Sequence, residues 1–131
     1  MNILLTILFC FTLNYPSSES FLDINDDVSA AIKTGNASNV AKFFPANIDL
    51  KVPPNKENLY SKAQAELILK DFFGKNPVKL FSIIHKSVSK NGDVSVIGSY
   101  ETASGKKFRT YSLFKKEGNK LTFQQLRFDV E

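Results

Sequence analysis

Apolar residues follow three different patterns along this chain of 131 residues. The first 20 residues contain one unbroken apolar run, from Ile3 to Leu13. Between residues 21 and 77 apolar side chains mostly recur every three or four positions, the spacing of a helix with one buried face. From residue 79 onward they alternate with polar residues, as in strands with one buried face. Helices followed by strands predict a single α+β domain after the initial run.

Two short helices are expected before residue 45. Asp26 or Asp27 would cap the first helix, and Gly35 would end it. Asn36 would cap the second, which Pro45 would stop because proline cannot continue a helix. The apolar residues that these helices would bury are Val28, Ala31, Ile32, Ala37, Val40, Ala41 and Phe44.

The third helix has the clearest signal in the sequence. Ser61 and Gln64 have the spacing of a capping box, in which each side chain accepts a hydrogen bond from the other residue's backbone. Gly74 fits the position just after the last helical residue, and Pro77 prevents the helix from resuming. The apolar stripe that we assign to the core consists of Ala65, Ile68, Leu69, Phe72 and Phe73.

Two short strands are expected between the helices, and a meander of four strands after them. Residues 47–52 alternate, and Leu59 and Tyr60 form a second, very short strand. In the meander, turn signals fall at Asn91-Gly92, Ser104-Gly105 and Gly118-Asn119, and Asn-Gly is typical of a two-residue hairpin turn. The four strands would span residues 79–90, 93–103, 106–117 and 120–130.

Two-residue turns would pair residue 90 with 93, 103 with 106 and 117 with 120, which assigns every side chain to a face. The more apolar face, which the helices would cover, carries the rows His85, Gly98, Tyr111, Leu126, then Ile83, Tyr100, Arg109, Phe128, then Ser87, Val96, Leu113, Gln124. The outer face would carry Ser99, Phe108, Thr110, Ser112, Phe114 and Phe123. A bulge of one residue would exchange the faces of part of a strand.

The order of these elements resembles the nuclear transport factor two-like superfamily, in which a curved antiparallel sheet and its helices form a cystatin-like cone with a pocket inside. In short motifs the chain is similar to a bacterial family of exported domains of unknown function, over nearly all of residues 26–131. The residues that carry this resemblance are Gly35-Asn36-Ala37, Tyr60 to Glu66, Asp71-Phe72-Phe73, Asn76-Pro77, His85, Phe108-Arg109, Tyr111 and Leu126-Arg127-Phe128. The superfamily includes isomerases, dehydratases and cyclases as well as non-catalytic binding domains, so the resemblance predicts a fold and no particular reaction.

The initial apolar run is interpreted as the core of a signal peptide. Its 11 residues are too few to span a bilayer as a helix, and a polar stretch with Pro16 follows. Ser18 and Ser20 have the spacing of a cleavage site, so we expect residues 1–20 to be removed and residues 21–131 to be exported, to the periplasm or beyond. Because the run is not preceded by Lys or Arg, a buried N-terminal helix is the alternative. After cleavage no transmembrane segment is expected.

Charge and side-chain chemistry narrow the candidate functions. The chain has 17 basic and 13 acidic residues, and the lysines are spread along it, which disfavours nucleic-acid binding. Cleavage would remove Cys10, the only cysteine, and with it disulfide and thiolate chemistry. His85 is the only histidine, and one histidine does not make a zinc site, so we expect no metal and no other cofactor.

The candidate site is a ligand pocket inside the cone. Five residues with polar tips share the predicted apolar face: His85, Tyr100, Arg109, Tyr111 and Gln124. Tyr60 and Asp71 are placed at the pocket mouth. A buried Arg109 needs an anionic partner, which favours an anionic small-molecule ligand unless a carboxylate of the chain reaches it.

Three functions are compatible with this arrangement. The leading one is an exported, non-catalytic domain that binds a small molecule or a partner segment in the cone. The first alternative is a small enzyme of isomerase or dehydratase type with His85 and Tyr111 as acid and base, which a carboxylate within hydrogen-bond reach of either would favour. The second is an interaction module of the cell envelope that forms a homodimer through the outer sheet face. A filled cone would exclude a ligand there.

Overall fold

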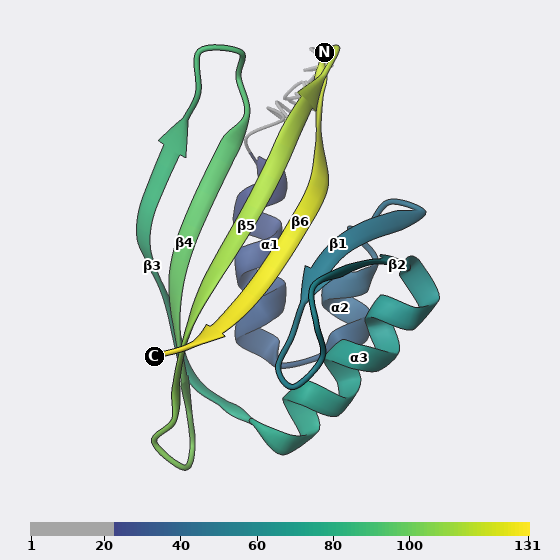
Figure 1. Cartoon of the computed structure of the whole chain (residues 1–131). Helices are drawn as coiled ribbons and strands as arrows, with labels where there is room; N and C mark the ends of the chain where they lie inside the picture. Colours follow the sequence, from purple (N-terminus) through teal and green to yellow (C-terminus); the bar gives the residue numbers. More distant parts are fainter. Residues whose placement is uncertain (1–22) are drawn as a thin grey trace, which may run out of the picture.

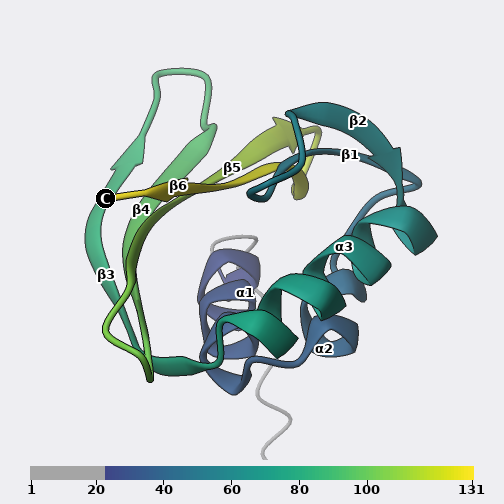
Figure 2. The ribbon, with the colours of Figure 1, turned by 60° about the horizontal axis from the view of Figure 1, so that its bottom comes forward.

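The computed structural model describes residues 23–131, which form three helices and one six-stranded sheet (Figure 1). The expected signal peptide and Cys10 lie outside the described residues. The sheet bends around the helices, which all lie on its concave side (Figure 2). The prediction of an α+β fold with a strongly curved sheet around about three helices is confirmed. Among residues 23–131 no helix is long and apolar enough to span a membrane.

The helices follow the predicted pattern with shifted ends. Helix α1 spans Asp23–Thr34, so Asp26 and Asp27 lie inside it and do not cap it. Helix α2 spans only Ala37–Ala41 and is capped by the side chain of Asn36, as predicted. Phe44 follows α2 and is still buried in the core.

Helix α3 spans Lys62–Lys75, and the predicted capping box is present. The hydroxyl of Ser61 accepts a hydrogen bond from the backbone of Gln64, whose side chain accepts one from the backbone of Ser61. Gly74 is still helical, and Asn76 is the C-cap, so the predicted end of this helix was wrong by two residues.

The strands are β1 (Asn47–Lys51), β2 (Asn58–Ser61), β3 (Val78–Val88), β4 (Val94–Thr102), β5 (Lys107–Glu117) and β6 (Lys120–Val130). Their order in the sheet is β2-β1-β6-β5-β4-β3. Strands β3 to β6 form the predicted antiparallel meander, while β1 pairs with β6 in parallel. Strand β1 thereby joins the N-terminal half of the chain to the sheet.

Two of the three predicted turns are longer than expected. Ser89 pairs with Asp93 around a loop of three residues, and Thr102 pairs with Lys106 in the same way. In both loops the third residue is a glycine with positive φ, which is typical of a turn followed by a bulge. The turn at Gly118-Asn119 has two residues, as predicted, because Glu117 pairs with Lys120.

These turns and two bulges change which side chains face the helices. The longer turn moves the register of β5 by one residue, so the predicted outer residues Phe108, Thr110, Ser112 and Phe114 are buried on the concave face. Strand β4 faces as predicted, and so do Leu126 and Phe128 of β6. The longer turn at Asn91-Gly92 likewise changes the facing of residues 85–88 of β3, and the first half of β6 changes with β5, to which it is paired. Bulges near Ile84 and Gln124 restore the predicted facing of residues 81–83 and of the second half of β6. A shift of one residue exchanges the two faces, because side chains alternate along a strand.

Aromatic rings pack the space between α3 and the sheet. Phe72 lies at the centre of this cluster, with its ring centroid 4.7 Å from that of Phe128 and 5.1 Å from that of Phe108. The other rings of the cluster are Phe73, Phe81 and Tyr100. The interior that the resemblance predicted to be a pocket is therefore a packed core beside these strands.

The two edges of the sheet differ. Edge strand β2 has four residues, and the chain enters α3 directly after it. Edge strand β3 has 11 residues, of which only Phe81 is buried. Its exposed large apolar residues are Leu80, Ile83, Ile84 and Val88.

Candidate functional site

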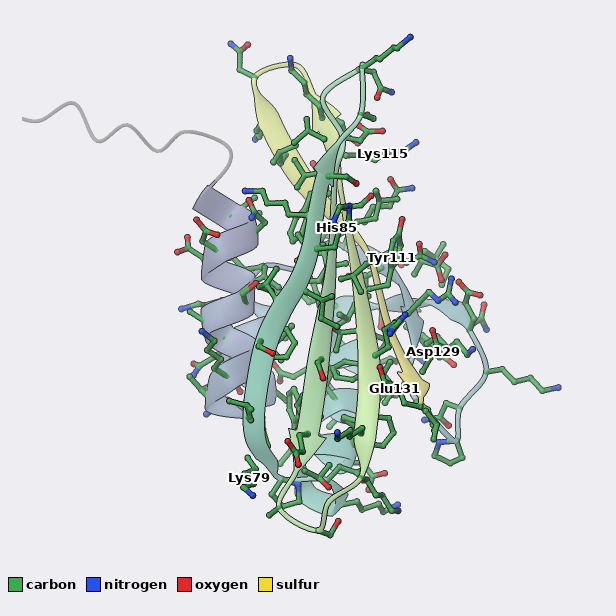
Figure 3. The ribbon with its side chains drawn as sticks, turned by 90° about the vertical axis from the view of Figure 1, so that its left-hand side faces the viewer. Lys79, His85, Tyr111, Lys115, Asp129 and Glu131 are labelled. Atoms are coloured by element: carbon green, nitrogen blue, oxygen red, sulfur yellow. The ribbon has the colours of Figure 1, made fainter. Side chains whose placement is uncertain are left out.

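The structure does not bring the five predicted pocket residues together. Tyr100 is fully buried on the concave face, as predicted. His85 pairs with Ile97 in place of Gly98, because the turn at Asn91-Gly92 has three residues, and therefore lies on the convex face. The labelled side chains of His85 and Tyr111 lie on this face in Figure 3, away from the helices. Gln124 is exposed at a bulge.

The remaining two predicted residues make contacts with charged partners on the convex face. Tyr111 lies under the guanidinium of Arg127, with 5.8 Å from the guanidinium carbon to the ring centroid. The Nε of Arg109 donates to a carboxylate oxygen of Glu131 at 3.3 Å. The predicted burial of Arg109 was wrong because β5 faces the other way. The predicted pocket of these five residues on the concave face does not form.

The two residues expected at the pocket mouth are also outside the interior. Tyr60 lies on β2, and its hydroxyl donates to the carbonyl of Lys56 at 3.0 Å. Asp71 lies on the exposed side of α3 and pairs with Lys75 at 3.0 Å. Asp71 does not line the cleft at the end of α3, whereas its partner Lys75 does.

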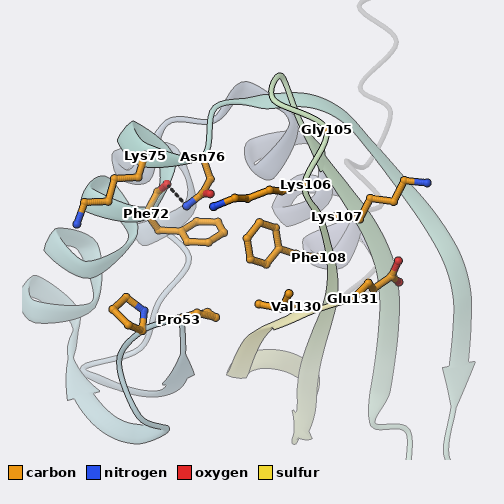
Figure 4. A pocket seen from close by; sticks show the side chains of 11 residues that line it. Pro53, Phe72, Lys75, Asn76, Gly105, Lys106, Lys107, Phe108, Val130 and Glu131 are labelled. Carbon is orange, nitrogen blue, oxygen red and sulfur yellow. Dashed lines mark hydrogen bonds between the residues drawn. The ribbon is translucent and has the colours of Figure 1, made fainter.

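A cleft of about 710 Å³ opens at the end of the sheet where α3 stops (Figure 4). Four segments that are distant in sequence meet there: the loop after β1, the end of α3, the β4–β5 turn and the end of β6. The lining residues are Pro53, Pro54, Phe72, Lys75, Asn76, Gly105, Lys106, Lys107, Phe108, Val130 and Glu131. Its volume is within the range of small-molecule pockets, about 300–1,000 Å³.

The floor of the cleft is rigid and apolar. Phe72 and Phe108 belong to the aromatic core and are almost fully buried. Beside them, the hydroxyl of Tyr100 donates to the backbone carbonyl of Asn76 at 2.6 Å, and the side chain of Asn76 donates to the carbonyl of Phe72. Burial raises the pKa of Tyr100 far above its ordinary value, so this hydroxyl keeps its proton at physiological pH. These bonds fix the end of α3 at the edge of the cleft.

The rim of the cleft is basic. Lys75 is paired with Asp71, and Glu131 is paired with Arg109. Lys106 and Lys107 make no ion pair among the described residues. In Figure 4 the side chain of Lys106 extends into the cleft beside the two rings, toward Asn76, whereas Lys107 and Glu131 point away.

Carboxylates elsewhere on the convex face show opposite pKa shifts. Burial, followed by repulsion from Glu57, raises the pKa of Asp49. A hydrogen bond from Lys51 foremost, at 2.7 Å, lowers the pKa of Asp129. Residues 23–131 contain no group of three or more side chains of the metal-binding types placed to share an ion.

Sequence reasoning missed the residues of this cleft. The sequence patterns assign Ser104-Gly105 to a turn, Lys106 and Lys107 to the start of the next strand, and Phe72 to the core. The one available signal was the Lys106-Lys107 pair directly after a turn glycine. Nothing in the sequence indicated that this turn would meet the end of α3.

The family of the chain follows from its match to a family model. The model for DUF4783, described as a domain of unknown function, matches residues 25–129. The chain belongs to this family. Its expected resemblance to a family of unknown function is thereby confirmed. Among the curated proteins, no match to the chain is found.

Solved structures of DUF4783 proteins have the same fold. A protein from Bacteroides uniformis is 30% identical, with a TM-score of 0.72, covering 82% of this chain and 97% of its own. A protein from Bacteroides ovatus is 27% identical, with a TM-score of 0.71, covering 80% of this chain and 93% of its own. An uncharacterized cystatin fold protein from Novosphingobium aromaticivorans, 13% identical, has a TM-score of 0.63 over 83% of this chain and 97% of its own. The last likeness shows the fold alone.

Proposed function

We propose that this protein is an exported, non-catalytic binding domain that takes an apolar ligand or partner segment in the cleft at the end of α3. The observation that carries the proposal is an open cleft of about 710 Å³ whose floor is made by Phe72 and Phe108. A concave site of this size with an apolar floor and few polar groups is the usual form of a small-molecule site. The proposed binding site therefore lies at the end of the cone, and not in the interior where the sequence predicted it.

Export is part of this proposal. It is supported by the apolar run from Ile3 to Leu13 and by the serines before residue 21. Native mass spectrometry of the secreted protein tests it, because an exported chain would begin at or near Phe21. A soluble product that still begins with Met1 would contradict export without affecting the cleft.

Binding in the cleft is tested with a neutral apolar dye, N-phenylnaphthylamine, whose fluorescence rises when it leaves water. We expect saturable binding to the wild type and a clear loss of affinity in Val130→Asp, which places a charge on the cleft wall. Val88→Asp is the matched control, since both valines are exposed strand-end residues, at 69% and 57%, and Val88 does not line the cleft. Equal binding to all three proteins, or none to the wild type, would contradict the proposal.

A homodimer is the second candidate function, and strand β3 is the observation that favours it. A long edge strand with exposed apolar residues presents unpaired backbone groups to another strand. The predicted dimer face, with Phe108, Phe114 and Phe123, is buried and unable to act in this way. Light scattering of wild type and Ile84→Lys at matched concentrations tests the edge, because the lysine would dissociate such a dimer. A wild-type monomer at all concentrations would exclude it.

The enzyme alternative lacks the geometry that would favour it. His85 and Tyr111 lie on strands separated by β4, with Ile97 between them in the row. Within residues 23–131 neither side chain hydrogen-bonds to a carboxylate, and the nearest polar partner of the Tyr111 hydroxyl is Ser95 at 3.5 Å. The geometry therefore supports no acid–base pair at these two residues.

A further inference from the structure

We propose that the ligand of the cleft is an organic anion with one charged head group on a hydrocarbon body, and that Lys106 binds the head group. This inference rests on the function proposed above and adds the chemical class of the ligand. Three observations support it: the charge balance of the rim, the way in which Lys106 is held, and the surface next to it.

The charge balance of the rim leaves a positive excess. The ammonium of Lys75 has its counter-ion in Asp71, and the carboxylate of Glu131 has its own in Arg109. Lys106 and Lys107 have none among the described side chains. Of these two, Lys106 extends into the cleft and Lys107 points out of it (Figure 4). An ammonium beside an apolar surface attracts an anion more strongly than one in open water, because the local dielectric is lower.

The backbone of Lys106 is fixed although its side chain is exposed. Its N–H donates to the hydroxyl of Thr102 at 3.0 Å, and its carbonyl accepts from the backbone of Thr102 at 2.8 Å. Thr102 is fully buried, so these bonds anchor the turn to the core. The backbone of Lys106 is therefore held in place, while its exposed side chain can adjust its position to a ligand.

The surface beside Lys106 suits a hydrocarbon body. The rings of Phe72 and Phe108 meet edge to face, and Val130 and Pro53 stand opposite them. A ligand with its apolar part on these rings would place its head group next to the Lys106 ammonium. A charge-assisted hydrogen bond of this kind is stronger than a neutral one.

Two dyes of similar body and different charge test the inference: anionic anilinonaphthalene sulfonate and neutral N-phenylnaphthylamine. We expect Lys106→Met to weaken binding of the sulfonate about tenfold, from the loss of one charge-assisted contact, and to leave the neutral dye unchanged. Lys115→Met is the matched control, because Lys115 is an exposed lysine of β5 that does not line the cleft, and it should bind both dyes as the wild type does. Decanoate should displace the sulfonate from the wild type at concentrations at which decanol does not.

The outcomes separate this inference from the proposed function. If the wild type binds both dyes and Lys106→Met binds the sulfonate normally, the anion inference is wrong and the apolar cleft stands. If the wild type binds neither dye, both proposals fail. Circular dichroism of each variant checks folding, and Lys106→Gln, which keeps a polar tip and loses the charge, should weaken the sulfonate as the methionine variant does. Unweakened sulfonate binding by Lys106→Gln would overturn the role of the charge.

Discussion

The two faces of the sheet are built from the same strands and hold the molecule together in different ways. On the concave face, β4, β5 and β6 present rings and aliphatic side chains that are almost completely buried under the helices. On the convex face, the alternate residues of the same strands make ion pairs and stay partly exposed. Burial of apolar area gives a large free energy, whereas exposed charge pairs give little because water screens them. The free energy of unfolding should therefore depend mainly on the residues of the concave face.

Removal of the central ring should have the largest effect. Phe72→Ala deletes the ring that contacts Phe128, Phe108 and Tyr100, and it leaves a cavity that the sheet cannot close. We expect a loss of about 3–5 kcal/mol in the free energy of unfolding, measured by denaturant titration.

Leu67→Ala is the control on the same helix, because Leu67 is 65% exposed. It should change stability by less than about 0.5 kcal/mol. Similar losses in the two variants would mean that α3 does not bury the face described here.

An added methyl group at Gly98 should have the second-largest effect. A Cβ there would lie 2.6 Å from the hydroxyl of Thr110 and 2.7 Å from the ring of Phe81, both buried. Gly98→Ala should therefore destabilise the protein by about 1–3 kcal/mol, the cost of overpacking a core.

Gly74→Ala is the control for Gly98, because Gly74 is helical and a Cβ there meets nothing within 4 Å. It should raise the free energy of unfolding by about 0.5–1 kcal/mol, since alanine favours a helix. A stabilised Gly98→Ala would show that Phe81 does not cover this position.

The faces of the sheet could be predicted only in part from the sequence. The strands, the Asn36 cap and the capping box follow from local patterns, and the structure has them. The facing of β5 depends on the length of the turn at Ser104-Gly105, which differs by one residue from the two-residue form. The charges of Lys107, Arg109 and Lys115 all fall on the same alternate positions of β5, and they would have indicated the correct outer face.

The candidate site was less predictable than the sheet. Each segment of the cleft has an ordinary local explanation: Pro53 ends a strand, Asn76 ends a helix and Gly105 makes a turn. The site exists because these ends meet in space, which depends on the twist of the sheet and the angle of α3. One additional residue in the turn at Asn91-Gly92 was enough to move His85 from one face to the other. Local sequence patterns do not determine such long-range placement.

The smallest effect is expected on the convex face, where Lys51 donates to Asp129 at 2.7 Å. Their side chains are 38% and 34% exposed, so Lys51→Gln should cost less than about 1 kcal/mol at neutral pH. Because the pKa of Asp129 is lowered in the folded protein, its ionised form stabilises the fold above the ordinary carboxyl pKa of about 3.9. This contribution is lost as the pH falls through the lowered pKa of Asp129.

The difference in stability between wild type and Lys51→Gln should therefore be largest near neutral pH and should disappear in acid. Lys115→Gln, a control at an exposed lysine, should show no such dependence on pH. NMR titration of the Asp129 carboxyl should show its pKa moving up in Lys51→Gln, though not fully to its ordinary value, since Arg127 still donates to it at 3.2 Å. A loss comparable to that of Phe72→Ala would break the comparison between the faces, because it would make an exposed ion pair as important as the aromatic core. A loss that grows as the pH falls would show that Lys51 does not stabilise the ionised form of Asp129.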